Sequence, residues 1–167
     1  RLDCQKNSID SLDISNNTAL IHLNCGENWF VGPLDVSNNT ALTWLDCWEN
    51  SLTSLDVSNN ISLNYINCYY NNLTSLDLSN NTLLEQLKCN RNNLDTLDLS
   101  NNTALILLWA DRNNFTSLDL SNNTALTNLD CNNTSLTALD VSSNTALTSL
   151  KCYNNDLTYL NMKNGVT

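Results

Sequence analysis

Residues 97–105 read LDLSNNTAL, and the rest of the chain is organised around copies of this stretch. A second string of the form LxCxxNxL alternates with it, as in residues 87–94. Together the two strings make a unit of 21 residues that is repeated almost eight times, which predicts a solenoid of stacked coils rather than a globule around one core. The seven copies of the first string, exact or closely similar, lie at 12–20, 34–42, 55–63, 76–84, 97–105, 118–126 and 139–147.

The composition of the 167 residues excludes some kinds of partner. The formal net charge is −10, which argues against nucleic acid and against an anionic membrane surface, because both need a basic face. No apolar run approaches the roughly 20 residues of a membrane-spanning helix, so we expect no membrane insertion. Only three glycines and one proline are present, and asparagine is expected to form the turns in their place, since it tolerates left-handed backbone geometry.

Seven cysteines occupy one repeat position, and Ala110 fills that position in the one unit without a cysteine. A position that accepts alanine suits a small buried apolar group. Neighbouring coils would place these residues about 4.8 Å apart, but parallel inward-pointing side chains do not offer the dihedral angle of a disulfide. A single evenly spaced column also lacks the clustered ligands of a zinc site. We therefore predict free, buried thiols, and no metal or other cofactor.

Each half of the unit has the same internal pattern, LxxLxLxxN or LxxLxCxxN. Alternation puts the two apolar residues of LxL or LxC on one side of a short strand and the middle residue on the other. The asparagine that follows falls at a turn, where its amide can satisfy backbone groups of its own coil and of the next. Two asparagine columns result, one at 7, 28, 50, 71, 92, 113 and 155, the other at 17, 39, 60, 81, 102, 123 and 144. Thr134 interrupts the first column.

This pattern resembles the leucine-rich repeat family, and in particular the short bacterial class with 21-residue repeats, sometimes called IRREKO, found in internalin-like surface proteins. The family normally has leucine where this chain has the cysteine column. The resemblance implies a β-rich, right-handed solenoid of about eight units, with a parallel sheet on the concave face, a second short parallel ladder opposite, and little or no α-helix. We expect residues 1–167 to form a single domain, and, since Arg1 already lies inside a repeat, to be a fragment of a longer surface protein.

The LDL half of the unit hardly varies, which favours a structural role. Its outward aspartates form a column at 13, 35, 56, 77, 98, 119 and 140. Carboxylates so close together repel one another, and we expect serine and threonine hydroxyls and backbone amides to compensate. The alternative is calcium binding along the column, since calcium prefers oxygen ligands.

The LxC half varies at its three outward positions, just before the leucine, between leucine and cysteine, and just after the cysteine. Alternation places all three on one face. Aromatic residues mixed with aspartate, asparagine and lysine are typical of a recognition surface, although cross-strand packing that only stabilises the sheet is an alternative. Trp44, Trp48, Tyr65 and Tyr69 are expected to form a four-ring cluster across neighbouring strands. The candidate ligand-binding residues are His22, Trp44, Asp46, Trp48, Tyr65, Asn67, Tyr69, Lys88, Trp109, Asp111, Lys151 and Tyr153.

Catalysis is not expected. His22 is the only histidine, and no serine or cysteine is uniquely placed beside it, so a histidine-based triad has no distinctive partner. The sequence therefore predicts a monomeric, non-catalytic recognition module of a secreted or cell-surface bacterial protein, located outside the cell, that binds a protein through the aromatic concave face. The alternatives are a carbohydrate-binding module that uses the same aromatic residues, and a passive structural spacer.

Overall fold

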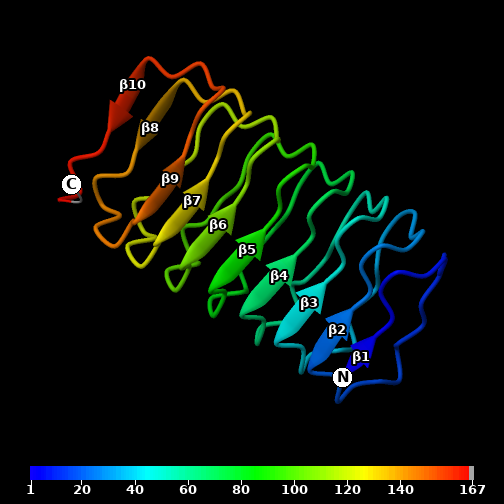
Figure 1. Ribbon diagram of the computed structural model, residues 1–167. Coiled ribbons are helices and arrows are strands. Elements are labelled where there is room, and N and C mark those ends of the chain that lie inside the picture. The colour runs from blue at the N-terminus through cyan, green and yellow to red at the C-terminus, as the bar shows by residue number, and fades with distance from the viewer. Residues whose placement is uncertain (166–167) are drawn as a thin grey trace.

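The computed structural model describes residues 1–165, which wind into a solenoid of stacked coils (Figure 1). Each coil contributes one short strand to an eight-stranded parallel sheet, in the order β1-β2-β3-β4-β5-β6-β7-β9. The predicted β-solenoid is confirmed, and the described residues contain no helix that could cross a membrane. The strands of the sheet are β1 (Leu2–Asp3), β2 (His22–Asn24), β3 (Trp44–Asp46), β4 (Tyr65–Asn67), β5 (Gln86–Lys88), β6 (Leu107–Trp109), β7 (Asn128–Asp130) and β9 (Ser149–Lys151).

Equivalent residues of successive coils pair directly across the sheet. The central residues of β2, β3 and β4 are aligned as Leu23, Leu45 and Ile66, and all three are fully buried. The backbone pairing continues past the ends of the strands, where the Cys25 amide donates to the Asp46 carbonyl at 2.8 Å. The residues on either side of each central leucine therefore point away from the core and form columns along the solenoid axis.

A second parallel ladder of two strands lies in the LDL halves of the solenoid. It consists of β8 (Ala138–Asp140) and β10 (Tyr159–Asn161), with Leu139 opposite Leu160. The predicted second short parallel ladder is thus present, and it joins the LDL halves of the last two coils. There Gly165 occupies the repeat position at which the preceding coils carry an asparagine. In those preceding coils an asparagine side chain bonds to the neighbouring backbone: Asn81 Nδ2 donates to the carbonyls of Val57 and Asn60.

The core is a set of stacked side-chain columns from both halves of the unit. The leucine columns are almost entirely buried, as at Leu87 and Leu99. The cysteine column lies among them, and the seven thiols are free, as predicted. Cys4 and Cys152, in the first and last positions of that column, are half-buried, whereas the other five are fully enclosed. No coil covers its own apolar side chains, so stability comes from stacking.

The first asparagine column joins the coils through side-chain hydrogen bonds, as predicted. Asn92, 6 % exposed, is representative. Its Nδ2 donates to the carbonyls of Cys89 in its own coil and Cys68 in the preceding coil, both at 3.0 Å. Its Oδ1 accepts from the Leu73 amide, also at 3.0 Å. One side chain thus satisfies three backbone groups that would otherwise be buried without partners.

The residue before each of these asparagines, or before Thr134, has a left-handed backbone. This conformation costs an L-residue roughly 1–2 kcal/mol, and here it is adopted by bulky residues rather than by glycine. The φ angle is 53° at Arg91 and 55° at Arg112. The full column is Lys6, Glu27, Glu49, Tyr70, Arg91, Arg112, Asn133 and Asn154. The following asparagine stabilises the turn, and the left-handed residue presents its side chain at the edge of the sheet.

Thr134→Asn should stabilise the domain by about 1–2 kcal/mol. By analogy with Asn113, the new amide would accept from the Phe115 amide and donate to the Ala110 carbonyl, two hydrogen bonds that Thr134 does not form. Each such bond contributes about 1 kcal/mol net. The measurement is the shift in denaturant midpoint. Thr137→Asn, an exposed change of the same type, should leave the midpoint unchanged, and an equal shift there would contradict the explanation.

Candidate functional site

The outward side of the eight-stranded sheet, called here the sheet face, carries three columns of side chains. The first column includes His22, Trp44 and Tyr65, which the strand register aligns. The second comes from the last residue of each strand and includes Lys88 and Trp109. The third comes from the residue after each cysteine. The variable side chains that the sequence singled out therefore all lie on the sheet face.

The first column forms a continuous stack of rings. The centroids of Trp44 and Tyr65 are 3.5 Å apart with an interplanar angle of 6°, and His22 stacks on the other side of Trp44 at 5.5 Å. Tyr65 is only 5 % exposed, and burial raises its pKa to about 12. Desolvation, with a smaller contribution from Arg1, lowers the pKa of His22. These rings cover one another and leave little free face to solvent.

The other two rings of the predicted four-ring cluster lie elsewhere. Tyr69 contacts Tyr70 rather than the Trp44–Tyr65 pair, with ring centroids 5.9 Å apart. The indole of Trp48 lies over Gly26, where an added Cβ would come within 2.2 Å of its Nε1. Glycine at this position of the third column gives the indole room to lie flat. The expected cluster is thus divided into a stack in the first column and separate rings in the third.

Two cations rest on ring faces beside the stack. The Lys88 Nζ lies 4.6 Å from the centroid of Trp109 and 5.3 Å from that of Tyr65. The guanidinium of Arg91 lies at 5.8–5.9 Å from Tyr70 and Tyr69. Such contacts hold a cation in place without neutralising its charge.

Lys88, Arg91 and Trp109 border a pocket of about 410 Å³ on the sheet face. Its lining residues belong to or follow the strands β3, β4, β5, β6, β7 and β9, so six neighbouring coils contribute to one hollow. Seven of the twelve candidate residues line it: Trp48, Asn67, Tyr69, Lys88, Trp109, Asp111 and Lys151. Asn90, Arg91, Arg112 and Asp130 complete the lining. The other candidates lie outside it, with His22, Trp44 and Tyr65 in the stack, Asp46 half-buried, and Tyr153 exposed on the last coil of the sheet.

Sequence reasoning missed Arg91 and Arg112. Both lie one position beyond the three outward columns, at the left-handed turn, and strand alternation says nothing about where a turn residue points. A signal was available, because this turn position varies from coil to coil as much as the outward columns do.

Partial burial raises the pKa of two carboxyl groups on the sheet face. Desolvation raises the pKa of Asp46, and the side chains of Asn67 and Trp44, followed by the charge of Lys88, offset part of that rise. Desolvation also raises the pKa of Asp111, with a further contribution from Asp130, while Arg112 and Arg91 act in the opposite direction. Both groups are therefore held beside cations in a setting of reduced polarity, where a charge interaction is stronger than in water.

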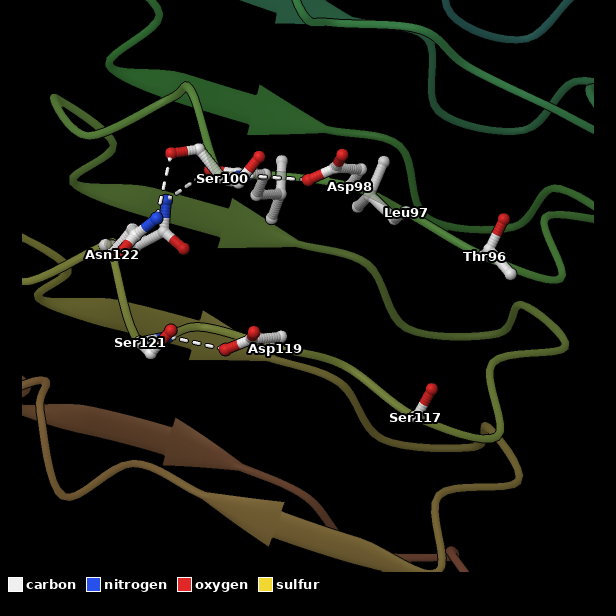
Figure 2. A pocket seen from close by; sticks show the side chains of 10 residues that line it. Thr96, Leu97, Asp98, Ser100, Ser117, Asp119, Ser121 and Asn122 are labelled. Carbon is white, nitrogen blue, oxygen red and sulfur yellow. Dashed lines mark hydrogen bonds between the residues drawn. The ribbon is translucent and has the colours of Figure 1, made fainter.

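The aspartate column on the LDL half has a local structural role. Figure 2 shows a second hollow, between two LDL halves, lined by Asp98, Ser100, Asp119 and Ser121. The Oδ1 of Asp98 accepts from the Ser100 amide, and that of Asp119 from the Ser121 amide, both at 2.9 Å. These bonds lower the pKa of both carboxyl groups. Residues 1–165 include no cluster of three or more histidine, cysteine, aspartate or glutamate side chains that could hold a metal ion.

Solved structures supply the comparison with known proteins; no protein-family model and no curated protein matches the chain. The chain is 41 % identical to the functional domain of InlJ from Listeria monocytogenes, with a TM-score of 0.90 over 95 % of this chain and 38 % of that one. InlF from Listeria monocytogenes is 23 % identical, with a TM-score of 0.74 over 88 % of this chain and 49 % of that one. The leucine-rich repeat ectodomain of the receptor kinase GASSHO1/SCHENGEN3 from Arabidopsis thaliana is 24 % identical, with a TM-score of 0.80 over 86 % and 19 %.

The chain spans less than half the length of each of these proteins. Below 25 % identity the likeness shows the fold alone, whereas the InlJ domain is close enough to compare residue patterns. That domain is described as including a cysteine ladder. This chain likewise has a column of seven cysteines, at the repeat position where the family usually has leucine. The chain belongs to the internalin-like class of leucine-rich repeat proteins with 21-residue repeats.

Proposed function

We propose that this domain is a non-catalytic recognition module of a secreted or cell-surface protein, and that it binds a protein partner through the sheet face. Leucine-rich repeat neighbours support protein interaction in general, and the Arabidopsis ectodomain is described in complex with CASPARIAN STRIP INTEGRITY FACTOR 2. The observation that carries the proposal is the distribution of sequence variation. Successive coils are nearly identical in the LDL half and differ mainly on the sheet face and at its bordering turn.

The chemistry of the sheet face supports a protein ligand. Trp109 is 40 % exposed, and it borders the pocket together with Trp48 and Tyr69. Partly exposed aromatic rings beside arginine are typical of the residues that contribute most to protein–protein binding energy. The carbohydrate alternative is less well supported, because Trp44 and Tyr65 stack on each other and Lys88 covers Tyr65 and Trp109. A sugar platform needs free ring faces.

The proposal is tested by selecting binders from a random twelve-residue peptide display library on the wild-type domain, with a glycan array in parallel. Selected peptides should lose affinity about tenfold or more for a Tyr69→Ala/Trp109→Ala variant, as expected when two central aromatic contacts are removed. Affinity is measured by fluorescence anisotropy. Asp77→Ala/Asp98→Ala on the opposite side of the coils is the matched control and should bind as the wild type does. Binding that is insensitive to the Tyr69/Trp109 change, or seen only on the glycan array, would overturn the proposal.

A further inference from the structure

The basic side chains of this acidic chain are concentrated at one place. The chain has seven lysine and arginine residues against seventeen aspartate and glutamate residues. Four of the seven line the pocket on the sheet face: Lys88, Arg91, Arg112 and Lys151. Asp111 and Asp130 are the acidic residues of the lining, so four positive and two negative groups give it a formal charge of +2 in a chain of −10. A positive concavity in a negative molecule is complementary to an anionic group.

Two of these four cations are already paired. The Arg112 Nε lies 3.9 Å from a carboxylate oxygen of Asp111, and the Lys151 Nζ lies 3.3 Å from one of Asp130. Lys88 and Arg91 take part in none of the ion pairs found within residues 1–165. Their charges are held on ring faces instead, where side-chain entropy is already reduced before a ligand arrives.

From this arrangement we propose that the pocket binds an acidic segment of the protein partner, with carboxylate side chains placed against Lys88 and Arg91. This rests on the proposed function and specifies the chemistry of its ligand. The guanidinium of Arg91 suits a carboxylate because its parallel N–H groups can donate to both oxygens. The accessible parts of Trp48, Tyr69 and Trp109 border the same pocket and contact the apolar portions of the segment.

The charge distribution also explains why an acidic segment would bind there and not elsewhere. The aspartate column on the opposite side of the coils repels carboxylates, so the pocket is a local exception on a negative surface. A basic partner would be attracted to that negative surface, but at the pocket it would meet Lys88 and Arg91, two cations that form no ion pair within residues 1–165. Repulsion of alternatives and attraction of the chosen ligand both contribute to specificity.

The test uses peptides selected on the wild-type domain as described above, together with each peptide's Glu/Asp→Gln/Asn version. The selected sequences should be enriched in acidic residues, and amide replacement should weaken binding at least about tenfold, as does loss of a charged hydrogen-bonded contact. Lys88→Gln/Arg91→Gln should cause a similar loss. Arg1→Gln/Lys6→Gln makes the same change in net charge outside the pocket, and it should alter affinity less than about twofold.

Charge reversal on both the domain and the peptide distinguishes a lost charge contact from a structural effect of the substitutions. Lys88→Glu/Arg91→Glu should bind the Glu/Asp→Lys version of a selected peptide better than the original, which a misfolded variant cannot do. If peptides bind through Tyr69 and Trp109 but show no acidic enrichment or no dependence on Lys88 and Arg91, the inference fails and the proposed function stands. If no peptide binds the sheet face, both fail. Binding of the carboxylated polysaccharide polygalacturonate in place of peptides would also overturn the inference.

Discussion

Asn92→Ala should unfold at a much lower denaturant concentration than the wild type, with a loss of at least about 3 kcal/mol. The substitution leaves the Cys68 carbonyl, the Cys89 carbonyl and the Leu73 amide without their side-chain partner in the middle of the array. Each buried backbone group left unsatisfied costs about 1–3 kcal/mol. The free energy of unfolding is obtained from urea titration followed by circular dichroism.

The chain supplies two comparisons for this variant. Asn101 also joins two coils, donating to the Ser79 carbonyl at 3.1 Å, but it is exposed, so Asn101→Ala should cost at most about 1 kcal/mol. Asn92→Thr should have an intermediate effect, because Thr134 in the same column keeps one bond to the carbonyl three residues before it. Equal losses of stability for Asn92→Ala and Asn101→Ala would show that the burial of the asparagine column does not determine its contribution to stability.

Phe115→Ala should destabilise the domain by about 3–5 kcal/mol, the range for removing a fully buried phenylalanine side chain. Phe115 is among the largest side chains with no solvent exposure, and its neighbouring coils stack on both sides. A cavity in one coil therefore weakens two interfaces at once. The urea midpoint reports the loss.

Phe115→Leu is the matched control, because Leu52, Leu73, Leu94 and Leu136 occupy the equivalent position in other coils. Replacement by a residue that the repeat already accommodates should cost less than about 1.5 kcal/mol. If Phe115→Leu were as damaging as Phe115→Ala, the loss would have to come from specific aromatic packing rather than from volume.

The fold follows from the repeat period because every coil meets nearly identical neighbours. An apolar residue that recurs at one repeat position must form a continuous column, so the buried Leu87 and Cys89 positions were predictable without coordinates. The role of Asn92 was also predictable, since an amide at a buried turn must bond to the backbone. The extent of the second ladder was not, because backbone pairing between LDL halves depends on small shifts of the strands that the repeat pattern does not describe.

The candidate site was predictable as a face but not as a pocket. Alternation places Lys88 and Trp109 on the same side of the sheet, yet it does not say that the ammonium lies on the indole. The direction of Arg91 depends on a left-handed φ of 53°, which no helical or strand period describes. Whether Trp44 and Tyr65 expose their rings or cover each other is decided by rotamers, and these are specified by packing rather than by position in the repeat.

Burial of the cysteine column lowers the reactivity of the thiols in this domain. Desolvation raises the pKa of Cys68 to about 12, and burial acts in the same direction on the other six thiols. Since the thiolate is the species that attacks disulfides and reacts with oxidants, a raised pKa leaves these thiols in the unreactive protonated form near neutral pH. Cys4 and Cys152 are the two thiols that are only half-buried. The coils between them shield the other five sulfur atoms from solvent, so a dissolved oxidant or a second thiol meets a steric barrier as well as a low thiolate fraction.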